Sequence, residues 1–206
     1  SEKPMRVVIL NQYYAPDVAS SGHLLFELAE EIAALGADTS VITCRPSYGP
    51  PESWQKCPRK ETKNGVKTLR MNATRFSKDS IIGRLVNIVS FMVPLTLFHV
   101  LPRRKGKVFM YTTNPPFLGF VGGFSSFVFR HNYVVLLHDA YPEIAVWLGK
   151  IKKNGCIDRF WQWCNKFMYN RPKRVIVLSE AAKELVANNY GTDRDRIHII
   201  PNWANP

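Results

Sequence analysis

Short apolar runs alternate with helical patterns along the whole 206-residue chain, and this alternation most constrains its fold. The first runs are "RVVIL" at 6–10 and "TSVIT" at 39–43, with an amphipathic helical pattern at 21–36 between them. Strands this apolar must be covered on both faces, which is typical of a parallel sheet with crossover helices. The sequence therefore predicts an α/β fold with a doubly wound, mostly parallel, Rossmann-like sheet.

The remaining elements follow the same alternation. Further strands are predicted at 66–70, 107–111, 133–138, 174–179 and 196–200. Further helices are predicted at 80–101, 115–129, 141–149, 155–170 and 179–189. The Pro-rich segment 44–65 is expected to be a loop. The glycines of the 115–129 helix are expected to allow close packing and not to form a phosphate loop; they are Gly119, Gly122 and Gly123.

Polar residues follow every one of these apolar runs. In open α/β sheets, ligands bind outside the carboxyl ends of the strands, so these residues are expected to converge on one rim. Part of the pattern is ordinary helix capping, and each position alone proves little. The residues are Asn11, Gln12, Thr43, Arg45, Asn72, Thr112, Thr113, Asn114, His138, Asp139, Ser179, Glu180 and Asn202.

The first strand–helix turn reads "NQYYAPDVASSGH". A dinucleotide-binding Rossmann protein would have GxGxxG here, whereas this turn keeps only Gly22, which argues against an NAD-dependent dehydrogenase. A helix N-terminus still offers free N–H groups to an anion. Ser20, Ser21 and Gly22 are therefore candidate contacts to a phosphate or sugar, and a plain helix cap is an equally good interpretation.

The stretch "VVLLHDAYPEIAV" places His138 and Asp139 at the end of a buried strand. A histidine there can donate a hydrogen bond to a substrate hydroxyl, and Asp139 can orient it or cap the turn. The alternative is a structural His–Asp pair that only holds the turn. Glu143, which opens the next helix, Asn114 and Asn202 complete the set of candidate binding residues.

The chain contains 28 Lys and Arg but 16 Asp and Glu, so its net charge is +12. Such a positive charge favours anionic partners. The hypothesis that the protein binds nucleic acid rests on this charge alone, since no helix-turn-helix, RRM or zinc pattern is present. The four cysteines show no metal-ligand spacing, so no metal site and reduced thiols are expected. No signal peptide is recognisable, which predicts a cytoplasmic protein.

The segment 81–101 is long and apolar, and the basic stretch "PRRKGK" follows it. A buried crossover helix is one interpretation, and a helix that docks partly into a membrane interface is the other. A transmembrane helix is the weakest interpretation, because the Rossmann pattern needs this segment as a crossover between two strands.

The chain resembles the retaining glycosyltransferases of family four, which have the GT-B fold. The matching pieces are "NQYYAPDVASSGHLLFELAEEIAALGADTSVIT", "LHDAYPE", "RVIVLSEAAKELV" and "IHIIPNWANP". The similarity is greatest to the branch that adds sugars to lipid-linked precursors of bacterial surface polysaccharides. The resemblance implies a Rossmann-like acceptor-side domain at 1–200 and the start of an interdomain hinge at 201–206. A C-terminal domain that binds the nucleotide-sugar donor is expected beyond this chain.

Carried onto this sequence, the resemblance implies that the Ser20–Ser21–Gly22 turn approaches the donor phosphates and the acceptor. His138 matches an active-site histidine that contacts the donor sugar. Many relatives have Gly-Gly where this chain has Ser21–Gly22. The sequence therefore departs from the family pattern at Ser21, where the backbone of those relatives approaches the ligand. The reaction implied is sugar transfer with retention, without a cofactor or metal, at the inner face of the cell membrane.

The function expected is transfer of a sugar to a lipid-linked, polyprenyl diphosphate glycan, in exopolysaccharide or O-antigen type synthesis. The partners implied are a nucleotide-sugar donor, this acceptor and an anionic membrane surface, without nucleic acid. The isolated domain is expected to be inactive. The alternative is a non-catalytic membrane- or partner-binding module whose catalytic half is a separate chain.

Overall fold

The computed structural model describes residues 4–17, 20–48, 51–77, 80–102 and 105–202. The chain forms two compact units, Ser1–Met110 and Tyr111–Pro206, which are described one at a time. Strand β5 (Val108–Thr112) contains the division between them.

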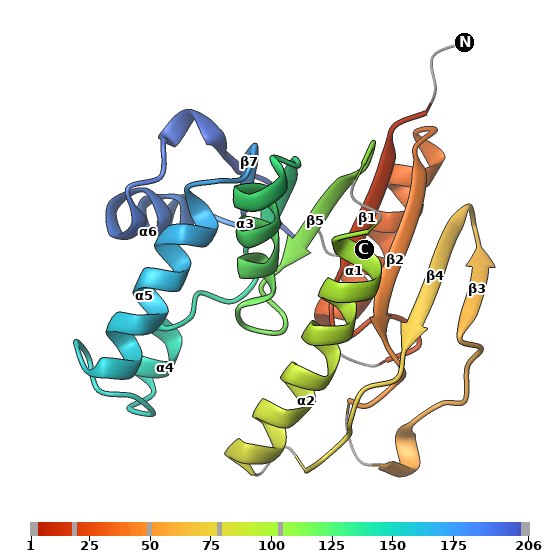
Figure 1. The fold of residues 1–206 in the computed structure, drawn as a ribbon, viewed down its shortest axis with the longest axis horizontal. Helices are drawn as coiled ribbons and strands as arrows, with labels where there is room; N and C mark the ends of the chain where they lie inside the picture. Colours follow the sequence, from red (N-terminus) through yellow and green to blue (C-terminus); the bar gives the residue numbers. More distant parts are fainter. Residues whose placement is uncertain (1–3, 18–19, 49–50, 78–79, 103–104, 203–206) are drawn as a thin grey trace. The chain divides into compact units, whose positions relative to one another are not determined.

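The first unit is built on strands in the order β3-β4-β2-β1. Strand β2 pairs in parallel with β1 and β4, and β3 pairs with β4 antiparallel. Helix α1 packs on β2 and β4, and Figure 1 shows α2 as a long helix of the same unit. The bounds are β1 Arg6–Leu10, α1 Ser20–Ala34, β2 Asp38–Cys44, η1 Pro51–Ser53, β3 Lys60–Lys63, β4 Val66–Met71 and α2 Ile81–Pro94.

The expectation of a loop throughout 44–65 was wrong, because β3 forms within it. Strands β3 and β4 are joined by Asn64 and Gly65, which both have positive φ, 49° and 79°. Two such residues form the tight turn that fits the twist of a β-hairpin. All four residues of β3 are polar, which suits an edge strand that faces water.

The predicted crossover helix at 80–101 is continuous but changes its winding at Pro94. Ser80 caps its start by accepting a hydrogen bond from the Gly83 N–H at 3.2 Å. Pro94 has no N–H to continue the α-helical ladder, and a π-helical turn, η2 (Leu95–Val100), follows it directly. The basic pair Arg103 and Arg104 lies outside the described residues.

The second unit contains the parallel strands β6, β7 and β8 with helices α3 to α6. Helix α3 packs against α5 and β6, and α6 packs against β7 and β8. The bounds are α3 Leu118–Phe129, β6 Tyr133–Leu136, α4 Glu143–Trp147, α5 Cys156–Tyr169, β7 Arg174–Val177, α6 Glu180–Tyr190, η3 Arg194–Arg196 and β8 Ile197–Ile199.

The glycines of α3 pack against bulky side chains, as predicted. A Cβ at Gly122 would lie 2.7 Å from the Tyr111 ring, and one at Gly123 would lie 2.9 Å from the Phe167 ring. A Cβ at Gly119 would lie 2.3 Å from the Met168 sulfur. Only glycine lets α3 approach its neighbours this closely.

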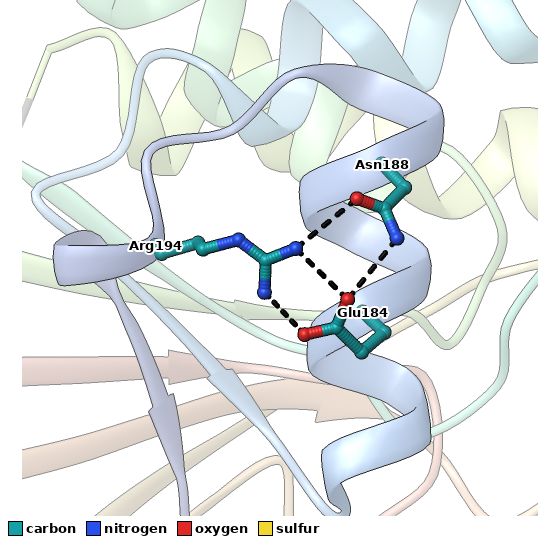
Figure 2. Close-up of polar contacts among 3 residues, drawn as sticks. All are labelled: Glu184, Asn188 and Arg194. Atoms are coloured by element: carbon teal, nitrogen blue, oxygen red, sulfur yellow. Dashed lines mark hydrogen bonds and ion pairs between the residues drawn. The ribbon is translucent and has the colours of Figure 1, made fainter.

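An ion pair ties α6 to the turn that leads into β8. Both guanidinium nitrogens of Arg194 contact the Glu184 carboxylate, and one also donates to Asn188 at 3.1 Å (Figure 2). Hydrogen bonding from Arg194 lowers the pKa of Glu184 to about 2. Because this ion pair is exposed, it contributes little to the free energy of unfolding. Its main effect is to hold the turn before β8 against α6.

These elements confirm the predicted α/β fold with a mostly parallel sheet. The positions of most predicted strands and helices are confirmed as well, because their apolar periodicity matches their burial. Residues 203–206 of the predicted hinge lie outside the described residues.

Candidate functional site

The first strand–helix turn, after β1, is held by side chains from distant parts of the first unit. The Asp17 carboxylate accepts hydrogen bonds from the Ser47 and Tyr48 N–H groups at 3.1 and 2.9 Å. The Tyr13 and Tyr48 rings meet edge to face, with centroids 5.4 Å apart. Burial, followed by the nearby Asp17 carboxylate, raises the pKa of Tyr13 to about 12. Tyr13 is therefore neutral at pH 7.

Arg70 fixes the middle of the same turn from β4. One guanidinium nitrogen donates to the Ala15 carbonyl at 2.9 Å, and another pairs with the Glu61 carboxylate at 2.8 Å. The Arg70 side chain is buried, so loss of Glu61 would leave a buried charge without its carboxylate partner. Arg70 therefore ties the described part of this turn to β4 and β3.

Helix α1 begins at Ser20, so the predicted Ser20–Ser21–Gly22 stretch forms its first turn. The side chains of Ser20 and Ser21 lie outside the described part of the structure. Gly22 is buried, and a Cβ there would lie 3.4 Å from the Tyr13 backbone, which is ordinary contact. The first turn of α1 carries main-chain N–H groups of the kind that bind anions, and contact with a phosphate or sugar stays a prediction.

In the second unit, Thr113 fixes the turn that carries His138 and Asp139. Its hydroxyl oxygen accepts the His138 N–H at 3.0 Å and the Asp139 N–H at 2.9 Å. Thr113 follows β5 and is buried, whereas the two N–H groups follow β6. One hydroxyl thus joins the ends of two strand segments at the predicted site.

The His138 imidazole is partly buried, and its Nε2 atom has no hydrogen-bond partner among the described residues. Burial lowers the pKa of His138, and the adjacent Asp139 carboxylate opposes this shift. The imidazole is therefore neutral at pH 7, and its Nε2 atom is buried. Asp139 itself is exposed.

Glu143 anchors the rest of the "HDAYPE" stretch to two neighbouring helices. Its Oε1 atom accepts hydrogen bonds from Tyr190 at 2.7 Å and from Gln162 and Asn189 at 3.2 Å each. Its Oε2 atom is buried and has no partner among the described residues. Asn165 extends the network by donating to the Tyr190 hydroxyl at 2.9 Å. The contacts give Glu143 a positioning role for this stretch.

The two predicted asparagines lie at different strand ends of the second unit. The Asn114 main chain exchanges hydrogen bonds with the Thr112 hydroxyl at 3.2 and 3.3 Å, which shapes the turn after β5. Asn202 follows β8 and is exposed.

The structure thus brings part of the predicted set together. His138, Asp139 and Glu143 share one turn and its helix in the second unit, with Asn114 directly after Thr113, while Ser20, Ser21 and Gly22 belong to the first unit. Among the residues that the structure describes, no group of three or more His, Cys, Asp or Glu side chains could hold a metal ion. Which of these residues bind substrate stays a prediction.

Two positioning residues, Asp17 and Arg70, were missing from the predictions, and Thr113 was named only as one of the polar residues that follow strands. The partners of Asp17 lie 30 and 31 residues away, and those of Thr113 lie 25 and 26 residues away. Such separations leave no trace in local periodicity. Thr113 was visible as a polar residue after a strand, but nothing in the sequence singled it out.

Comparison with known proteins agrees with this geometry. A family model described as a glycosyl transferase 4-like domain matches residues 22–203. The probable glycosyltransferase WbjE of Pseudomonas aeruginosa is 28% identical over 101 residues, which cover 49% of this chain and 25% of that protein. The matching stretch is thus a minor part of that relative.

Two solved structures share the fold at low sequence identity. A sucrose-phosphate synthase from Thermosynechococcus elongatus matches with a TM-score of 0.60 at 14% identity, covering 96% of this chain and 48% of that one. Anabaena Alr3699/HepE in complex with UDP and glucose matches with a TM-score of 0.57 at 16% identity, covering 96% and 44%. The chain spans about half the length of these proteins or less. The resemblance seen in the sequence is confirmed, and the chain belongs to the glycosyl transferase 4-like domain family.

Proposed function

We propose that this chain is the acceptor-side domain of an enzyme that transfers a sugar from a nucleotide-sugar to a lipid-linked glycan with retention. The acceptor would be a polyprenyl diphosphate glycan, used in exopolysaccharide or O-antigen type synthesis at the cytoplasmic face of the membrane. Family membership supports sugar transfer. The Anabaena relative was solved with UDP and glucose, which supports a nucleotide-sugar donor.

The observation that carries the lipid-linked acceptor is an exposed apolar stripe along α2 and η2. The stripe consists of Ile82, Leu85, Val89, Val93 and Leu97, whose exposed fractions lie between 50 and 73%. These residues recur every three or four positions, so they share one helical face. A soluble domain gains nothing from such a face unless a partner covers it.

The opposite face of the same helix packs into the first unit. Phe91 and Leu95 are fully buried there. Asn87 is buried too, and its side chain hydrogen-bonds the Phe76 main chain in both directions at 3.0 Å. The segment Ile82–Val100 is long and apolar enough to cross a membrane by length and composition alone. Its buried, hydrogen-bonded face favours a helix that lies in the membrane interface.

The turn at His138 suits the proposed chemistry. A neutral imidazole can exchange a hydrogen bond with a sugar hydroxyl. Retaining transfer then needs the protein mainly to position the two substrates and to stabilise the leaving diphosphate. The helix N-terminus at Ser20 supplies N–H groups of the kind that bind such an anion.

Sugar transfer by the full-length protein tests the proposal. The protein is incubated with a panel of nucleotide-sugars and a synthetic polyprenyl diphosphate glycan, and the anomeric configuration of the product is read by NMR. We expect one donor to be used and its anomeric configuration to be kept. Inversion would refute retention, and no transfer from any donor would favour a non-catalytic module.

A further inference from the structure

Helices α3 and α5 of the second unit carry an exposed surface of aromatic side chains. We define this aromatic surface as Phe120 and Phe127 of α3 with Phe160, Trp163 and Phe167 of α5. Phe127, Phe160 and Trp163 are 65, 60 and 57% exposed. Figure 1 shows the two helices side by side, and they are in contact.

The five rings form one continuous patch. Along α5, Trp163 lies 6.2 Å from Phe160 and 6.3 Å from Phe167, measured between ring centroids. Across to α3, Phe167 lies 5.1 Å from Phe120 and 6.2 Å from Phe127. Ile157, one turn before Phe160, is 62% exposed and extends the patch.

The exposed rings of this patch, Phe127, Phe160 and Trp163, lie outside the core of the second unit. Helix α5 buries Cys164, Asn165 and Met168 on its other side. Phe167 packs on Gly123 of α3, and contact between the two helices also runs through Gly119 and Met168. Aromatic rings left in water at this density cost free energy unless something covers them.

The charges around the patch are cationic. The Arg171 guanidinium lies 3.8 Å from the Phe167 ring centroid and 5.3 Å from that of Phe127, and Lys166 is exposed between Trp163 and Phe167 in the sequence. Helix α3 contains no acidic residue, and the single acid of α5, Asp158, is buried and accepts the Asn154 N–H at 2.7 Å. The occupant should therefore be anionic.

We propose that the aromatic surface inserts into the headgroup region of an anionic lipid bilayer. Trp and Phe side chains beside Lys and Arg are the residues that favour the membrane–water interface. A second copy of the chain is a poorer occupant, since a symmetric contact would bring Arg171 and Lys166 against their own counterparts. This contact is additional to the α2 stripe, and it does not depend on sugar transfer.

Fluorescence quenching by brominated lipids tests the position of Trp163. The 206-residue chain is mixed with vesicles of phosphatidylglycerol and phosphatidylcholine with brominated acyl chains. We expect Trp163→Phe to bind as the wild type does but to lose a substantial part of the quenching. Trp161→Phe is the matched control, because Trp161 stacks on Tyr141 inside the unit and its loss should leave the absolute intensity of the quenched fluorescence unchanged.

Affinity measurements test the same surface independently. Phe160→Ser with Trp163→Ser should weaken vesicle binding about tenfold or more, because interfacial burial of two large rings is lost. Lys166→Gln should weaken it about fivefold at low salt, while Lys56→Gln in the first unit serves as its matched control. Circular dichroism establishes that each variant is folded.

Three results would overturn this inference. The first is that the chain does not bind anionic vesicles. The second is that it binds them with Trp163 unquenched and with the affinity of the Phe160→Ser, Trp163→Ser variant unchanged, which would leave α2 as the proposed contact. The same variant could instead convert a dimer into a monomer in sedimentation without changing vesicle affinity, which would assign the surface to self-association.

Discussion

The single most informative residue is His138, whose imidazole is positioned from its main chain. Thr113 holds the backbone of the turn, and the ring keeps Nε2 without a partner among the described residues. A side chain that only stabilised the turn would be expected to use both ring nitrogens inside the protein. Ligand contact by His138 stays a prediction, and the purely structural His–Asp pair is the alternative that the following experiment tests.

Replacing His138 by Ala in the full-length protein should lower kcat about a hundredfold or more with little change in Tm. The reason is that a positioned hydrogen-bonding side chain contributes mainly in the transition state. Kinetics and thermal melting of the same preparation measure both quantities. His198→Ala, at an exposed position on β8, is the matched control. An unchanged rate with a large drop in Tm would assign His138 a structural role.

The imidazole of His138 should titrate below its ordinary pKa of about 6.5. Burial is the cause, since it disfavours the charged form in the folded state. The unfolded chain then binds more protons between the folded pKa and 6.5, so this group lowers stability as pH falls through that window and costs nothing above it. NMR titration of the 206-residue chain gives the midpoint. A value at or above 6.5 would contradict the described burial.

Thr113 offers a residue-scale test of the turn itself. Thr113→Val removes the acceptor for two N–H groups and should destabilise the chain by about 1–3 kcal/mol. Thr113→Ser keeps the hydroxyl and should recover most of that loss. Urea unfolding compares the variants. Equal destabilisation by Val and Ser would mean that the methyl group, and not the hydroxyl, matters at this position.

At the scale of elements, the sequence predicted what periodicity encodes. Buried strands such as β1 and β7 are apolar runs, and the cap of α6 is a Ser179 that accepts the Ala182 N–H at 3.2 Å. Strand β3 was missed because its polar residues resemble a loop. The Asn64–Gly65 pair was the available signal, since Asn-Gly is the strongest short marker of a hairpin.

The site was less predictable than the elements for a physical reason. The contacts that position it join residues far apart in the sequence, such as Arg70 and the Ala15 carbonyl, 55 residues away. Local pattern reports which residues end a strand, but not which distant side chain holds them there. The exposure of the α2 stripe is likewise a tertiary fact, because an apolar helix has the same sequence whether it is covered or not.

Helix α3 should tolerate no side chain at its glycine contacts. Gly122→Ala would place a methyl group against the buried Tyr111 and Tyr133 rings, 2.7 and 2.8 Å away, and should cost about 1–3 kcal/mol. Gly22→Ala on α1 is the matched control, since its new Cβ would meet only ordinary contacts at 3.4 Å. Chemical unfolding of both variants decides the matter. Equal stabilities would show that α3 and its neighbours are less closely packed than described.

At the scale of the whole molecule, we propose that this chain supplies only the acceptor side of the reaction site. The matched relatives are at least about twice as long, and donor recognition is proposed to lie outside this chain. We therefore predict that the 206-residue chain alone transfers no sugar. Turnover by the purified chain with a nucleotide-sugar and acceptor would contradict this division of labour.

The central claim, that this domain serves a lipid-linked acceptor at a membrane, is tested most directly by comparing two acceptors. The full-length protein is given the same glycan either on polyprenyl diphosphate in anionic vesicles or on a short, water-soluble diphosphate. We predict that Ile82→Ser with Val89→Ser lowers kcat/KM for the vesicle-borne acceptor about tenfold and leaves that for the soluble acceptor unchanged. Equal use of both acceptors, with neither affected by the substitutions, would contradict the claim.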